Sequence, residues 1–127
     1  MPRPIHFEIH AEDPERAMAF YAGLFGWKFE YYMADYWSVV TGEEGTPGIN
    51  GGLVRRRGGA PAEGQPVSAF VCTLDVPSVD EYLEKVTAAG GKVAEPKMPI
   101  PGMAWLAYCL DTEGNLFGMF EEDPTAQ

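Results

Sequence analysis

The sequence is poor in basic residues. Nine Lys and Arg stand against 19 Asp and Glu, which gives a formal net charge of −10 at pH 7. A protein that binds a polyphosphate needs the opposite balance, so nucleic acid is not expected as a partner. The one basic run, residues 55–57, is interpreted as a solvated surface, with an anion-binding patch as the alternative.

Cysteine and long apolar runs are also scarce. Cys72 and Cys109 are the only cysteines, and neither belongs to a CxxC pair, so the usual zinc and dithiol motifs are excluded. We expect both to be buried, reduced thiols. No apolar run approaches the roughly 18 residues of a membrane span, and the first residues do not form a signal-peptide core. The expectation is a cytoplasmic protein with no membrane partner.

Three motifs of large enzyme classes are missing: GxSxG, the P-loop and GxGxxG. The first presents a nucleophilic serine and the other two hold phosphates, so their absence disfavours nucleophilic catalysis and nucleotide cofactors. The chain has 127 residues, of which 46% are hydrophobic and 22% charged. This is the length and composition of a single globular domain.

Residues 5–11 alternate strictly between apolar and polar side chains, and this period of two predicts a strand. The apolar face carries Ile5, Phe7, Ile9 and Ala11, and the polar face carries His6, Glu8 and His10.

A helix is predicted directly after this strand. Asp13 suits its N-cap, Pro14 its first helical position and Gly26 its end. An apolar stripe that should lie on a sheet comprises Ala17, Phe20, Tyr21 and Leu24. Three strand-like runs follow at residues 28–33, 36–41 and 49–56.

The same order recurs in the second half. Ser78 fits an N-cap, and a second helical stripe repeats the first at a constant offset of 62 residues, from Ala17 to Val79. Strands are expected at residues 67–76, 92–95, 103–110 and 116–121. The pattern predicts a duplicated βαβββ module within one domain. Its parts are module one at 4–57, a linker at 58–66, module two at 67–122 and a tail at 123–127.

The predicted fold class is α+β. Each module should form a curved, mixed but mostly antiparallel sheet with its helix on the convex face. The two concave faces should then pair into a cup for a small ligand.

Four segments together resemble the vicinal oxygen chelate superfamily, also called the glyoxalase/bleomycin-resistance/dioxygenase proteins. They are the strand at 5–11, the helix start at 13–21, the Leu-Phe-Gly-Trp run at 24–27 and the Asp-x-x-Gly-Asn segment at 111–115. The resemblance covers essentially the full length and is nearest to small glyoxalase-like members. It implies the paired-module cup and, as in many relatives, a homodimer.

In metal-dependent members of that superfamily, four ligands come from the first and last strands of the two modules. The resemblance places these positions at His6, near Ala69, within residues 50–52 and at Gly118. One histidine is too few, because catalytic metals generally keep three protein ligands. No cofactor is therefore predicted. A zinc, nickel, iron or manganese ion held through His6 is the alternative.

The polar face of the first strand carries the candidate catalytic residues. If that face lies inside the cup, as the resemblance implies, Glu8 between His6 and His10 could act as a base near neutral pH. The same residues could instead orient a ligand without chemistry, or simply face solvent.

Six aromatic residues fall on candidate cup strands, and most are expected in the core or at the rim. They are Tyr31, Tyr32, Tyr36, Trp37, Trp105 and Tyr108. Candidate ligand-binding residues are Trp37, Asn50, Trp105 and Tyr108. A cup lined by rings and a few polar groups suits a small, partly apolar molecule.

Three functions remain open. The first is a metal-independent enzyme that moves a proton on a small carbonyl or phenolic compound, as an isomerase or lyase does. The second is a protein that sequesters a small molecule without chemistry, as bleomycin-resistance relatives do. The third is a metal-dependent lactoylglutathione lyase or extradiol dioxygenase.

Overall fold

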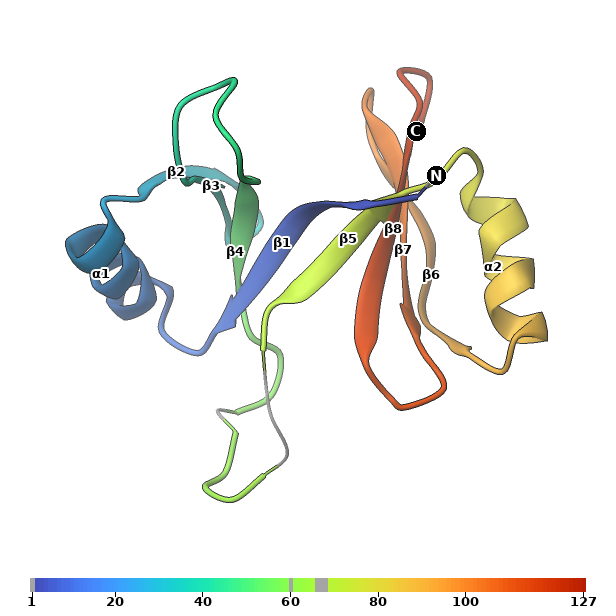
Figure 1. Ribbon diagram of the computed structural model, residues 1–127, viewed down its shortest axis with the longest axis horizontal. Helices are drawn as coiled ribbons and strands as arrows, with labels where there is room; N and C mark the ends of the chain where they lie inside the picture. Colours follow the sequence, from blue (N-terminus) through green and yellow to red (C-terminus); the bar gives the residue numbers. More distant parts are fainter. Residues whose placement is uncertain (1, 60, 66–68) are drawn as a thin grey trace. The chain divides into compact units, whose positions relative to one another are not determined.

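A computed structural model describes residues 2–59, 61–65 and 69–127. The chain divides into two compact units (Figure 1). The N-terminal unit comprises residues 6–70. The C-terminal unit comprises residues 71–127 together with the N-terminal residues up to Ile5.

In the N-terminal unit, one helix covers one face of a four-stranded sheet. Its elements are β1 (Pro4–Ala11), α1 (Pro14–Phe25), β2 (Lys28–Met33), β3 (Tyr36–Val40) and β4 (Gly51–Arg55). The strand order is β2-β3-β4-β1, with β4 and β1 parallel and the other pairs antiparallel. Beneath α1, the core is built around Phe7, Ile9, Ala11, Val39 and Leu53.

The C-terminal unit repeats this plan. Its elements are β5 (Val71–Asp75), α2 (Val79–Ala88), β6 (Lys92–Ile100), β7 (Ala104–Leu110) and β8 (Leu116–Glu122). The strand order is β6-β7-β8-β5, with β8 and β5 parallel. The predicted α+β class and the duplicated βαβββ order are both confirmed.

Strand limits differ from the prediction in two places. Within the described residues, β5 begins at Val71, and the predicted start at 67 lies outside them. The sixth strand continues to Ile100 instead of ending at residue 95. Pro96 lies within the second of two register shifts, between Glu95 and Met98, where β6 bulges at the edge of the sheet and a residue without an N–H is tolerated.

The helix caps follow the sequence. Asp13 Oδ1 accepts a hydrogen bond from Arg16 N at 3.1 Å, and Gly26 ends α1 in the left-handed conformation at φ 73°. Ser78 caps α2 in the same way, accepting from Glu81 N at 3.1 Å. No helix in the described part of the chain is long and apolar enough to cross a membrane.

The buried face of α1 was predicted correctly only in part. Phe20 and Leu24 are 57% and 62% exposed, whereas Ala17, Met18 and Tyr21 pack against the core. The helix is turned so that Tyr21 stacks on Trp27, with ring centroids 5.1 Å apart. That aromatic contact, which spacing alone does not reveal, sets the facing of α1.

Two further burial predictions need correction. Ile5 is 43% exposed, although the other apolar residues of its strand are buried. Cys109 is buried as expected, but Cys72 is exposed because the core cluster beneath α2 does not extend to it.

Candidate functional site

A polar row crosses the N-terminal sheet on the face opposite α1. Strand register aligns Glu8 of β1 with Gly52 of β4, Gly52 with Ser38 of β3, and Ser38 with Glu30 of β2. Because aligned residues point to the same face, these positions share one surface. The alternation predicted for β1 adds His6 and His10 to it.

Glu8 lies at the β1 end of this row, between His6 and His10 along the strand. It is only 8% exposed, and its Oε1 accepts a hydrogen bond from His10 Nε2 at 2.8 Å. A buried carboxylate is costly unless its oxygens are hydrogen-bonded, so the imidazole stabilises Glu8 and fixes its orientation. The alternative of a simple solvent-exposed face is wrong for Glu8.

Tyr36 also belongs to this site, although the sequence did not single it out. Its hydroxyl and His6 Nε2 form a hydrogen bond of 3.2 Å, although the two residues are 30 positions apart in the sequence. A Cβ on Gly52 would overlap the Tyr36 hydroxyl, so the phenol crosses β4 only because position 52 has no side chain. Tyr36 was one of six aromatic candidates, and only the pairing of β3 with β4 distinguishes it.

Burial sets the charges of His6 and Tyr36. Desolvation lowers the pKa of the half-buried His6 below its usual 6.5, and the nearby Glu8 carboxylate opposes this shift. Desolvation, with a further contribution from Glu8, raises the pKa of Tyr36 to about 12. Near pH 7 both groups are neutral, so the site combines a carboxylate with two neutral hydrogen-bonding groups.

Arginines fix the end of β1. Arg56 Nη2 donates to the His10 carbonyl at 2.7 Å, and Arg55 Nε contacts Asp35 Oδ2 at 3.2 Å.

Beside His10 lies a hollow of about 380 Å³ at the start of α1. Its lining residues are Ile9, His10, Ala11, Glu12, Asp13, Arg16, Ala17, Phe20 and Tyr21.

The structure places Trp37 and Asn50 away from Glu8. Trp37 faces α1 and packs against the core, because it aligns with Leu53 rather than with Gly52. Asn50 is exposed, and its Oδ1 accepts from Thr41 N at 2.9 Å, just before β4 begins. Ligand contact by either residue stays a prediction, and neither enters the proposed site.

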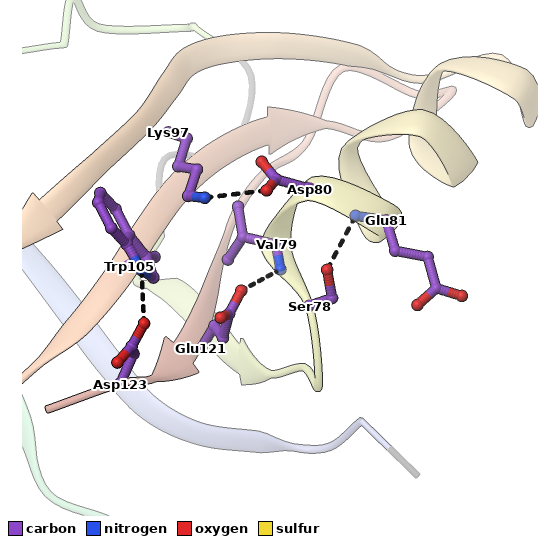
Figure 2. Close-up of polar contacts among 8 residues, drawn as sticks. All are labelled: Ser78, Val79, Asp80, Glu81, Lys97, Trp105, Glu121 and Asp123. Carbon is purple, nitrogen blue, oxygen red and sulfur yellow. Dashed lines mark hydrogen bonds and ion pairs between the residues drawn. The ribbon is translucent and has the colours of Figure 1, made fainter. Parts of the chain in front are cut away.

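Trp105 is held within a polar network beside α2 (Figure 2). Its Nε1 donates to Asp123 Oδ2 at 3.0 Å, and Lys97 Nζ lies 4.3 Å from the centre of the indole ring while bonding Asp80. The indole packs against the core beneath the helix. This arrangement gives Trp105 a structural role, and ligand contact by it stays a prediction.

Tyr108 occupies the opposite face of the C-terminal sheet. It aligns with Gly118, which in turn aligns with Thr73. The row therefore repeats the one through Gly52, with buried Thr73 at the position of Glu8. Tyr108 is half-buried there and stays a candidate for ligand contact.

The four metal positions implied by the resemblance do not fit a metal ion. Ala69 has no donor atom, the place beside Gly52 is filled by the Tyr36 phenol, and a Cβ on Gly118 would lie 2.8 Å from Thr73 Oγ1. Among the described residues at these positions, Asn50 offers only an amide oxygen that already accepts from Thr41 N, and His6 is the one good donor. Within the described residues, no group of three or more His, Cys, Asp or Glu side chains could hold a metal.

Comparison with known proteins identifies the family. The family model of the Glyoxalase/Bleomycin resistance protein/Dioxygenase superfamily matches residues 3–119. The chain belongs to this superfamily. A search of curated proteins finds no match.

Solved structures agree with this glyoxalase-superfamily fold. A superfamily member from Vibrio splendidus 12B01 aligns with a TM-score of 0.65 and 14% identity, covering 96% of this chain and 100% of that one. Methylmalonyl-CoA epimerase from Mycobacterium tuberculosis gives 0.64 and 13%, covering 95% and 88%.

A third structure extends the comparison to a metal-bound relative. The Mn(II)-bound glyoxalase from Novosphingobium aromaticivorans gives a TM-score of 0.58 and 21% identity, covering 98% of this chain but 39% of that one. Identities this low establish a shared fold. The chemistry of this chain has to be argued from its own residues.

Proposed function

We propose that this glyoxalase-superfamily protein binds a small organic molecule against the polar face of its N-terminal sheet and moves a proton on it. Glu8 is the base. The observation that carries the proposal is a carboxylate only 8% exposed, oriented by His10 and set beside the neutral Tyr36–His6 pair. Carboxylates buried among neutral hydrogen-bonding groups are found at proton-transfer sites, which supports this role.

The two histidines have different roles. His10 donates to Glu8 Oε1 and points the carboxylate, so it is a positioning residue. His6 forms a hydrogen bond with the Tyr36 hydroxyl. It also lies close enough to Glu8 for the carboxylate to raise its pKa and so oppose the effect of burial. The reaction class is isomerase-like when the proton returns to the substrate and lyase-like when a leaving group departs instead, and neither needs an oxidant or a nucleophile.

The proposed reaction requires no metal ion. Three of the four positions at which metal-dependent relatives place ligands have no suitable donor here. The epimerase among the structural neighbours provides an example of the class, since epimerisation removes a proton from a carbon and returns it.

Exposed rings favour a second candidate function, sequestration without chemistry. Tyr32 is exposed and lies edge-on to Tyr36, with ring centroids 6.4 Å apart. The ring of Tyr32 could hold a flat molecule against the polar face. In that case the carboxylate of Glu8 would orient the ligand without removing a proton.

Deuterium exchange separates the two functions. Carbonyl compounds with an acidic α-hydrogen, beginning with methylmalonyl-CoA, are incubated with the protein in heavy water, and uptake of deuterium is followed by mass spectrometry. We expect the wild type to catalyse exchange and Glu8→Gln to reduce its rate by roughly 100-fold or more, the usual contribution of a general base.

Glu30→Gln is the matched control. Glu30 lies in the same cross-strand row but is exposed, so its substitution should leave the exchange rate unchanged. Equal exchange rates for wild type and Glu8→Gln would rule out Glu8 as the base. Tight ligand binding with no exchange would support sequestration.

A further inference from the structure

We infer that Tyr36 is a second catalytic residue of this site and that the substrate is an enolisable carbonyl compound, with its oxygen at the Tyr36 hydroxyl and its α-hydrogen at Glu8. The inference rests on the proposed function. It adds the group that stabilises the developing negative charge and thereby the chemical class of the substrate.

The placement of the phenol supports this role. Tyr36 aligns with Val54, yet its ring runs diagonally until the hydroxyl lies over Gly52. Gly52 is the direct neighbour of Glu8 on the adjacent strand, and paired strands lie roughly 5 Å apart. The Glu8 carboxylate is also near enough to raise the pKa of Tyr36. The hydroxyl and the carboxylate can therefore contact the same small carbonyl compound.

The Tyr36–His6 hydrogen bond orients the phenol. Both groups are neutral near pH 7, so one hydrogen atom lies between them. In the arrangement we infer, His6 Nε2–H donates to Tyr36 Oη, which leaves the phenol O–H directed at the ligand. His6 is then a positioning residue that acts through Tyr36.

The resulting step balances without a further reagent. Glu8 takes the α-hydrogen as a proton, the C–H electron pair becomes the new C=C bond, and the carbonyl π pair moves to oxygen. Tyr36 donates its hydrogen bond to that oxygen as it becomes an enolate. Return of the proton from Glu8 to the same carbon gives exchange or epimerisation, and in a conjugated enolate its return to the far end of the conjugated system gives an isomer.

A purely structural tyrosine would not need this geometry. A ring that only packs could end short of β4, whereas this one lies above a glycine whose every substitution would displace it. The hydroxyl is also the part of Tyr36 that reaches the polar row. The placement of Tyr36 therefore favours a role for its hydroxyl group over a packing role for its ring.

Phenolate binding tests the inference without knowledge of the substrate. 4-Nitrophenolate mimics an enolate, and its affinity is measured by calorimetry at a pH where the probe is ionised and Tyr36 is not. Tyr36→Phe should weaken binding roughly tenfold or more, the contribution of a hydrogen bond to a charged group. Glu8→Gln should tighten binding, because it removes a negative charge beside the anion.

Gly59→Ala is the control, since it adds a methyl group in open space. It should bind the probe as the wild type does. Gly52→Ala, which displaces the phenol, should match Tyr36→Phe. Equal affinities for wild type and Tyr36→Phe, with both folded by circular dichroism, would overturn the inference.

Nitrogen-15 NMR of His6 gives an independent readout. The inference requires the hydrogen on Nε2, and a neutral His6 protonated on Nδ1 would contradict it. The proposed function fails separately: a protein that binds phenolate through Tyr36 but exchanges no α-hydrogen has the anion site without the reaction.

Discussion

Among single residues, His6 shows most clearly how burial and function are coupled. Its ring is half-buried, so the charged form is disfavoured, although Glu8 lies near enough to oppose the effect. A neutral imidazole can hold the Tyr36 hydroxyl in either tautomer, whereas a protonated one can only donate. The state of His6 therefore bears on both stability and the geometry of the site.

The lowered pKa of His6 predicts an acid-sensitive stability. Since the folded state holds His6 with a pKa below 6.5, the unfolded chain binds more protons as the pH falls through 6.5. The free energy of unfolding should be greatest above that pH and decline below it. His6→Asn should flatten the decline between about pH 6.5 and 5. Urea denaturation over a pH series measures it, and an unchanged slope in the variant would contradict the assignment.

For individual helices and strands, the N-terminus of α2 depends on a residue far away in sequence. Glu121 Oε1 of β8 accepts a hydrogen bond from Val79 N at 2.8 Å, and Ser78 satisfies a second donor of the same turn (Figure 2). Val79 is fully buried, so water cannot replace the carboxylate. The first turn of α2 is thus tied to the strand on which it lies.

Loss of this tie should destabilise the protein measurably. Glu121→Ala leaves the Val79 N–H without its carboxylate, at a cost of about 1–3 kcal/mol in the free energy of unfolding. Glu122→Ala, at the exposed next position, should change stability by less than about 0.5 kcal/mol. Chemical denaturation of both variants provides the comparison. Equal effects would show that Glu121 does not act as a cap.

At the scale of the whole molecule, both modules carry the same cross-strand glycine but differ in what stands beside it. Gly52 is flanked by Glu8 and Ser38, and Gly118 by Thr73 and Tyr108. The two modules therefore share the same strand pairing around the glycine. The carboxylate of Glu8 stands beside it in the N-terminal unit, where the C-terminal unit has Thr73. Neither glycine position supplies a side-chain metal donor.

Metal content tests this distribution of donors directly. Protein purified without chelator, and again after incubation with zinc, nickel, iron or manganese, should contain far less than one metal ion per chain by elemental analysis. The reason is that His6 is the only suitable donor among the four positions implied by the family. A stoichiometry near one would contradict the metal-free proposal and favour lactoylglutathione lyase or dioxygenase chemistry.

The sequence by itself determined the features that depend on neighbouring residues. Period-two alternation identified β1 and its polar face, Asp13 and Gly26 marked the limits of α1, and the 62-residue offset revealed the repeat. These signals are local, because caps and periodicity are set within one or two turns of chain.

Tertiary structure alone decided which side chains meet. Tyr36 and Trp37 are adjacent and both aromatic, yet register turns the first toward Glu8 and the second into the core. A shift of one residue in strand pairing would exchange them. The contact of Tyr36 with His6, and its passage over Gly52, join residues distant in sequence. No local pattern encodes them, since each depends on how β3, β4 and β1 align.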